Sequence, residues 1–153
     1  MSSQGKLVKT ISRRHDRSWL GKPRCSACAP DGSFAIASSQ GDKRFVTFYQ
    51  PDGTSVKTIS LPQNTHYPNI AFDGSNLVIG NTKMVTYCKV SKGVFFQFTP
   101  ESTAGPATDW QPFILNGGKE LVLFDGDSKA LKRYELPAGD NDWSHPTPLQ
   151  LRI

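Results

Sequence analysis

The chain has 153 residues, a mass of 16.9 kDa and 37% hydrophobic residues, so it is long enough for one domain with a real core. No run of about 18 apolar residues occurs, and the N-terminal sequence MSSQGKLVK has no apolar stretch. We therefore expect neither a membrane span nor a secretory signal. The three cysteines are an odd number, which fits a reducing compartment better than a disulfide framework, and we expect a cytoplasmic or nuclear location.

The net charge of +5 is unevenly distributed. Residues 1–24 hold seven basic residues and one acidic residue, whereas residues 101–153 hold five basic and eight acidic residues. Such asymmetry is typical of a patch that binds nucleic acid or an acidic surface, or of two chain ends that attract each other. We do not expect nucleic acid as a partner, because the basic region offers only Trp19 for stacking on bases.

The first predicted element is a strand at residues 5–12, GKLVKTIS, in which side chains alternate between two faces. Its VKTIS motif recurs at residues 56–60, in the last strand of the first complete repeat, so the chain is predicted to begin on a final strand. After a basic loop, residues 25–60 read as four short strands joined by PDG, QGDK and PDG turns. In such turns proline fixes φ and glycine adopts the positive φ.

The second repeat is the clearest. Its short alternating segments are rich in Val, Ile, Phe and Tyr and have turn residues between them, which is typical of one antiparallel four-stranded sheet. The predicted strands are Asn69–Phe72, Asn76–Gly80, Met84–Val90 and Val94–Thr99.

The third repeat begins at residue 111, with hairpin turns at NGG and DGD and strands at Leu121–Phe124 and Ala130–Leu136. Residues 140–153 are either its fourth strand or the first strand of another repeat. The spacing of the aromatics favours the second option. An aromatic precedes the first strand of each repeat, at intervals of 48, 43 and 33 residues: Trp19, Tyr67, Trp110 and Trp143.

Two segments carry a resemblance to β-propellers of the NHL or WD-repeat type. NIAFDGSNLVIGN, residues 69–81, resembles the first two strands of a blade, and DKRFVTFYQPDGTSVKTIS, residues 42–60, resembles the outer two. The resemblance implies four-stranded blades of about 40–50 residues. We predict a single all-β repeat domain over residues 1–153, with about three antiparallel blades. Their approximate limits are 19–62, 63–105 and 106–142, with strand remnants at 5–12 and 147–153.

Three blades are fewer than the roughly four to eight that close a propeller. An open fan leaves sheet edges unpaired, so we expect either several copies or a longer chain to complete the ring. The opposite charges of the two ends favour head-to-tail contact. The alternatives are a β-trefoil, which has three repeats in a chain of this length but whose QxW signature is absent here, and a β-sandwich.

The repeated aromatics Trp19, Tyr67, Trp110 and Trp143 are candidate binding residues on one rim of the fold. Flat amphipathic rings there would anchor a protein partner or stack on sugars. The structural alternative is that they fill the gaps between neighbouring blades.

The densest charge cluster is RRHDR, residues 13–17. Arg13, Arg14 and Arg17 are candidates for binding phosphate, sulfate or an acidic partner, because guanidinium groups match such oxyanions bidentately. The alternative is a solvated loop whose charges aid solubility.

The sequence CSAC, Cys25 to Cys28, has the spacing of a redox or zinc pair, but a second such pair is absent from the sequence and no metal site is predicted. We expect these thiols to act as small apolar side chains. The aspartates Asp31, Asp52, Asp73, Asp125 and Asp127 are explained by turn chemistry.

No catalytic motif occurs in the chain, and we predict neither a catalytic residue nor a cofactor. The first hypothesis is a non-catalytic module for protein–protein interaction or self-association into a closed ring. The second is a lectin that binds carbohydrate through the aromatic rim. The third is a domain that contributes part of an active site to a completed propeller.

Overall fold

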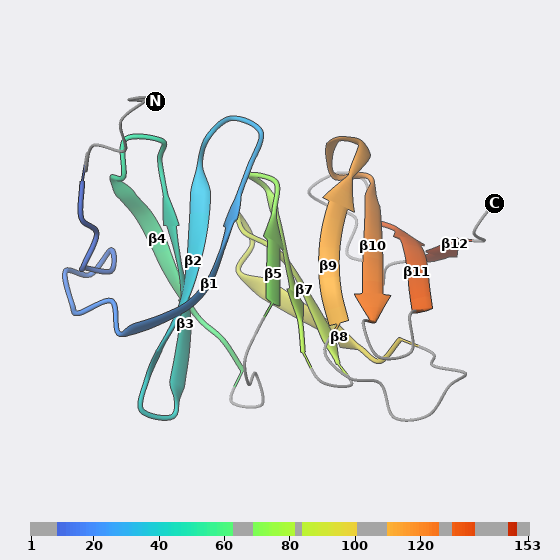
Figure 1. The fold of residues 1–153 in the computed structure, drawn as a ribbon, viewed down its shortest axis with the longest axis horizontal. Helices are drawn as coiled ribbons and strands as arrows, with labels where there is room; N and C mark the ends of the chain where they lie inside the picture. Colours follow the sequence, from blue (N-terminus) through green and yellow to red (C-terminus); the bar gives the residue numbers. More distant parts are fainter. Residues whose placement is uncertain are drawn as a thin grey trace.

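The computed structural model describes residues 9–62, 69–81, 84–100, 110–125, 130–136 and 147–149. In these residues the fold is all-β, as predicted, with twelve strands and one short 3-10 helix. The strands form three antiparallel four-stranded sheets, which lie one after another without closing into a ring (Figure 1). The described part of the chain contains no helix that could cross a membrane.

Each sheet is built from four strands that are consecutive in the sequence. The first sheet consists of β1 Lys22–Cys28, β2 Phe34–Gln40, β3 Lys43–Tyr49 and β4 Ser55–Ser60. The second sheet consists of β5 Asn69–Phe72, β6 Asn76–Gly80, β7 Val85–Lys89 and β8 Val94–Phe98. The third sheet consists of β9 Trp110–Leu115, β10 Glu120–Asp125, β11 Ala130–Glu135 and β12 Thr147–Leu149, and the 3-10 helix η1 Asn116–Gly118 joins β9 to β10.

The predicted turn chemistry accounts for the hairpins. In both PDG turns the glycine has a positive φ, +86° at Gly32 and +83° at Gly53. The preceding aspartates accept hydrogen bonds from backbone amides two residues later, from Ser33 to Asp31 at 2.9 Å and from Thr54 to Asp52 at 2.8 Å. The pKa of both carboxyl groups is lowered, that of Asp31 chiefly by the hydroxyl of Ser33 together with its amide, and that of Asp52 chiefly by the amide of Thr54. Turn chemistry does not explain Asp125 as we predicted, because this residue is the last of β10 and is buried.

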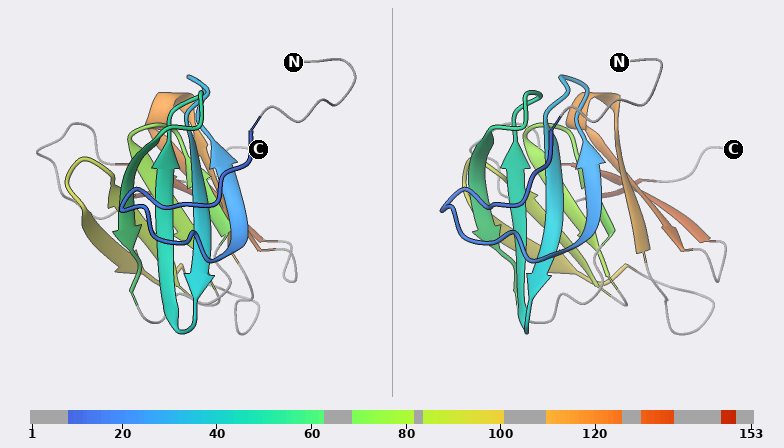
Figure 2. Two further views of the ribbon diagram at one scale, coloured as in Figure 1. Left: turned by 90° about the vertical axis from the view of Figure 1, so that its left-hand side faces the viewer. Right: turned by 60° about the vertical axis from the view of Figure 1, so that its left-hand side comes forward.

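The second sheet is covered on both faces. All residues of β6 and β7 are buried, and alternate side chains point to two separate cores. Leu77, Ile79 and Cys88 pack with the first sheet. Val78 and Tyr87 pack with the third sheet. The second sheet is therefore the middle layer of the fold (Figure 2).

Successive sheets are closest at their first strands, since β1 contacts β5 and β5 contacts β9. A close approach of the backbones also occurs where β6 meets β9. A Cβ atom on Gly80 would meet the backbone carbonyl of Trp110 and the ring of Pro112. Only glycine fits at this position without separating the two sheets.

Two predictions about the chain ends differ from the structure. Thr147–Leu149 forms β12, which pairs antiparallel with β11 and is the fourth strand of the third sheet instead of the first strand of another repeat. Residues 9–12 are not in a strand, although the alternation of GKLVKTIS predicted one. Their backbone lies outside the first sheet, where β1 to β4 already pair with one another.

Replacing Gly80 by alanine should weaken the packing of the second sheet on the third. The new Cβ would overlap rigid backbone, so we expect Gly80→Ala to lower the free energy of unfolding by about 3 kcal/mol, measured by urea denaturation. Gly41→Ala is the control: its Cβ meets nothing within 4 Å, and only its φ of +58° opposes the change, at a cost of about 1 kcal/mol. Equal losses in the two variants would contradict the close approach of the sheets.

Candidate functional site

Residues 9–21, the N-terminal segment, cover the face of the first sheet that points away from the second sheet (Figure 2). The amide of His15 donates to Thr58 Oγ1 at 3.1 Å, and the hydroxyl of Tyr49 donates to the backbone oxygen of Arg13 at 3.1 Å. The amine of Lys9 donates to the backbone oxygen of Asp52 at 3.2 Å. The N-terminal segment thus occupies the place where a further sheet would otherwise pack.

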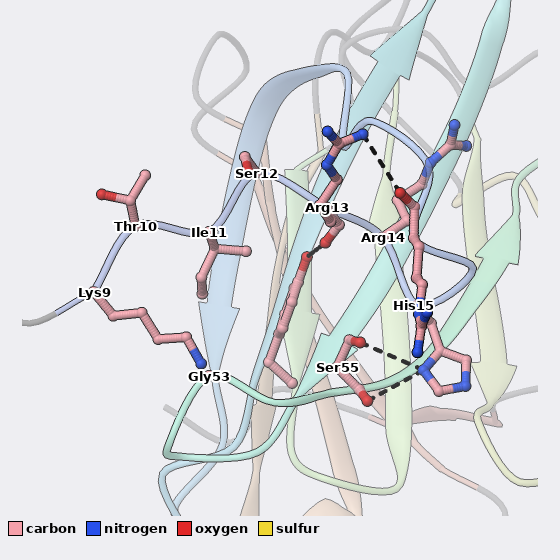
Figure 3. Close-up of a pocket in the computed structure, with 11 residues that line it drawn as sticks. Lys9, Thr10, Ile11, Ser12, Arg13, Arg14, His15, Gly53 and Ser55 are labelled. Atoms are coloured by element: carbon pink, nitrogen blue, oxygen red, sulfur yellow. Dashed lines mark hydrogen bonds between the residues drawn. The ribbon is translucent and has the colours of Figure 1, made fainter.

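A groove of about 420 Å³ lies along the N-terminal segment and is lined by basic side chains (Figure 3). The guanidinium of Arg13 donates to the backbone oxygen of Arg17 at 3.5 Å, and Figure 3 shows it pointing away from Lys9 and His15. His15 Nδ1 lies 3.1 Å from the backbone oxygen of Ser55. Because the cations do not converge on one point, the groove lacks the geometry of a preformed oxyanion site.

Arg14 has a structural role and is not available as the binding residue that we predicted. Its side chain is buried, with Nε donating to the backbone oxygen of Trp19 at 3.0 Å and Nη2 donating to Gln40 Oε1 at 2.9 Å. Its guanidinium carbon lies 3.8 Å from the centroid of the Phe45 ring, which is a cation–π contact. Arg14 therefore fastens the N-terminal segment to the first sheet.

Arg14→Ala should destabilise the protein. The substitution removes the contact with Phe45 and two hydrogen bonds from a charged donor, to Trp19 and Gln40, so we expect a loss of about 2–3 kcal/mol in chemical denaturation. Arg14→Lys should recover only part of this loss, because an ammonium group cannot reproduce the planar contacts. Arg13→Ala, at an exposed neighbour, should change stability by less than about 0.5 kcal/mol. Similar losses at residues 13 and 14 would refute the structural role of Arg14.

The two described aromatics of the predicted rim lie in different environments. Trp19 is 60% exposed in the N-terminal segment, as a binding residue requires. Trp110 is fully buried, because it is the first residue of β9 and shares its inward face with Pro112 and Ile114. Its indole nitrogen has no hydrogen-bond partner in the described part of the chain. Trp110 therefore fills the space between two sheets, and the other two predicted positions, Tyr67 and Trp143, lie outside the described residues.

Among the described residues, three of the five exposed large apolar side chains lie on the outer face of the third sheet, the face that points away from the second sheet. Its apolar centre contains Phe113, Leu115 and Leu131, which are 50%, 46% and 41% exposed. The half-buried Val122 and Phe124 connect them, because Val122 is the cross-strand neighbour of Phe113, and Phe124 is that of Leu131. The third sheet packs on the second through its other face, and no other described strand covers this one.

The same face carries charge beside its apolar centre. Arg133 donates two hydrogen bonds to the carboxylate of Glu120, one of them from Nε at 3.1 Å, and these bonds lower the pKa of Glu120. Glu135 is the cross-strand neighbour of Glu120 and is exposed. It has no ion-pair partner among the described residues. Among these described side chains, the outer face thus has one surplus negative charge.

We did not predict this face from the sequence, although a signal was present. The segments around Phe113 and Val122 are apolar at consecutive positions instead of alternating, which is typical of strands buried on both faces. In the structure only one of those faces is covered by another sheet.

A second groove, of about 440 Å³, lies between the first two sheets. Phe48, Phe72 and Val90 are among the side chains that line it. The amine of Lys57 crosses it and donates to the backbone oxygen of Val90 at 2.9 Å. The charged end of Lys57 is thus held by the protein itself.

The cysteine pair CSAC lies in β1, where residues three apart point to opposite faces. Cys25 is half-buried and packs against the core between the first two sheets, whereas Cys28 is exposed. The two thiols therefore cannot act together as a redox or zinc pair. Within the described residues no cluster of three or more metal-ligating side chains occurs.

The thiols should differ in reactivity. Burial raises the pKa of Cys25 and of Cys88 to about 11, so thiolate is scarce at pH 8. We expect one fast-reacting thiol, Cys28, when the native protein is treated with a chromogenic disulfide reagent, and three in urea. Cys28→Ser should remove the fast phase alone. Two fast thiols in the native protein would contradict the burial of Cys25.

The comparisons support the fold without identifying a function. No protein-family model matches the sequence, and no curated protein matches it. One similar solved structure is a crystal structure of a protein from Lactobacillus plantarum, determined by the Northeast Structural Genomics Consortium. It is 16% identical with a TM-score of 0.56, over 84% of this chain and 40% of that protein. This chain therefore spans less than half the length of that neighbour.

Proposed function

We propose that the chain is a non-catalytic assembly module that binds a second copy of itself through the outer face of the third sheet. The observation that carries the proposal is the exposure of Phe113, Leu115 and Leu131 together on one face. Contiguous apolar surface of this kind marks interaction sites on proteins. The opposite net charges of residues 1–24 and 101–153 favour a copy of the same chain as the partner.

We also propose that the three sheets are successive blades of an incomplete β-propeller. The approach of the first strands, β1 to β5 and β5 to β9, supports this arrangement, because blades meet at their inner strands around a common axis. The greater length of the structural neighbour is compatible with it. The carbohydrate-binding alternative has less support, since it needs a repeated exposed rim and Trp110 is buried.

The size of the outer face predicts a weak interaction. Strands of about six residues are roughly 20 Å long, and four of them span about 15–20 Å, which gives an area of about 300–400 Å². Stable interfaces bury about 800 Å² on each partner. We therefore expect dissociation constants in the micromolar range or weaker for this face alone.

The test is the mass of the 153-residue protein in solution, by light scattering and sedimentation, from about 10 to about 500 μM. We expect the wild-type mass to rise above 16.9 kDa with concentration, and the double variant Phe113→Ser/Leu131→Ser to stay near it. Polar side chains at these positions remove the apolar centre of the face and leave the core intact.

The matched control is Val56→Ser, which removes another exposed apolar side chain, 51% exposed, on β4 of the first sheet. It should associate as the wild type does. Circular dichroism and thermal unfolding verify that all variants are folded. A wild-type protein that remains monomeric over the whole range refutes the proposed function.

A further inference from the structure

The self-association proposed above leaves open which surface of the second copy meets the outer face of the third sheet. Figure 1 places the N-terminal segment outside the first sheet, at one end of the long axis, and the third sheet at the other end. The N-terminal segment therefore cannot reach the outer face of its own third sheet. Any contact between these two surfaces is a contact between copies.

The N-terminal segment presents one large apolar side chain from a fixed backbone. Trp19 is 60% exposed, yet its backbone pairs with Arg13 and its carbonyl accepts the hydrogen bond from the buried Arg14. The next residue, Leu20, is buried, and its amide donates to Ser12 at 3.0 Å. An exposed tryptophan on an ordered backbone is a favourable anchor, because little entropy is lost when it binds.

Exposed arginines lie in the same segment as this anchor. The side chains of Arg13 and Arg17 are both exposed, and the guanidinium of Arg17 has no hydrogen-bond or ion-pair partner among the described residues. On the outer face of the third sheet, Glu135 is exposed beside Glu120, and Arg133 is already paired with Glu120. The two surfaces are thus complementary in charge, and each has an apolar centre.

Resting on the proposed function, we propose that copies of this chain associate head to tail. Trp19 of one copy packs on Phe113 and Leu131 of the next copy, and the exposed arginines of the first copy lie beside the Glu135 carboxylate of the second. Each pair of copies then keeps one free surface of each kind, the outer face of the first copy and the N-terminal segment of the second, so the contact repeats in an open chain or a ring. Contact between two N-terminal segments is disfavoured, because both are basic.

The decisive experiment mixes two variants of the full chain. Trp19→Ala alters the basic surface and keeps the outer face of the third sheet, whereas Phe113→Ser/Leu131→Ser does the reverse. Each variant alone should associate about 30-fold more weakly than the wild type, which is the loss expected when a hot-spot side chain is removed from an interface. Mixed in equal amounts, they should form a one-to-one dimer and nothing larger, because one intact surface of each kind remains.

The outcomes separate this inference from the proposed function. If Trp19→Ala associates as strongly as the wild type and only the Phe113→Ser/Leu131→Ser variant is monomeric, then two third sheets meet face to face: self-association stands and the head-to-tail contact is refuted. If the mixture forms no dimer although each variant is folded and monomeric, the head-to-tail contact is also refuted. A monomeric wild type refutes both proposals.

Charge reversal provides an independent check. Arg17→Glu and Glu135→Arg should each weaken association by about tenfold, and a mixture of the two should regain affinity through the exchanged pair. Raising the salt concentration from about 50 to about 500 mM should weaken the wild-type association through screening. Lys92→Glu, at an exposed position in the turn before β8, is the control for a general effect of charge. An equal effect of Lys92→Glu, or an association that salt does not change, would overturn the charge pairing.

Discussion

Burial of both faces of the second sheet is the constraint on which the rest of the fold depends. Every residue of β6 and β7 is buried, and alternate side chains enter two separate cores. A sheet with two apolar faces is stable only when both are covered, so the first and third sheets are each required to cover one. The middle sheet thereby fixes the order of the layers. Each outer sheet is left with one face that packs against no other sheet of the described residues.

The two outer sheets differ in how that remaining face is treated. On the first sheet the face is partly polar, with Thr47 and Thr58 bonded to each other at 3.0 Å, and the N-terminal segment lies over it. Arg14 holds the segment by stacking its guanidinium on Phe45, so a charged side chain covers this aromatic ring. On the third sheet the face is apolar, and no other described strand covers it. Within the described residues, the outer face of the first sheet is therefore covered and that of the third sheet is exposed.

Local chemistry explains what could be predicted from the sequence. The strands of the second sheet, and the glycines with positive φ in the PDG turns, depend on neighbouring residues alone, and both predictions are confirmed. The role of Trp110 depends on which face of β9 meets the second sheet, and the pairing of β12 depends on the free edge of β11. Both depend on contacts between segments that are distant in the sequence, so local patterns could not predict them. For the candidate site, charge and sequence identified the basic segment. They could not separate the buried Arg14 from its exposed neighbours, nor reveal which sheet face is uncovered.

The difference between the two ends gives the proposed assembly a direction. A basic segment with an exposed tryptophan at one end and an apolar face with a surplus carboxylate at the other are complementary, whereas two basic ends repel. Each contact is small, so a single one gives only weak binding. In a closed ring every copy makes two contacts, and the last contact forms within one particle at a high effective concentration. Weak contacts between copies therefore suffice for a stable ring, provided that the angle between the two ends permits closure.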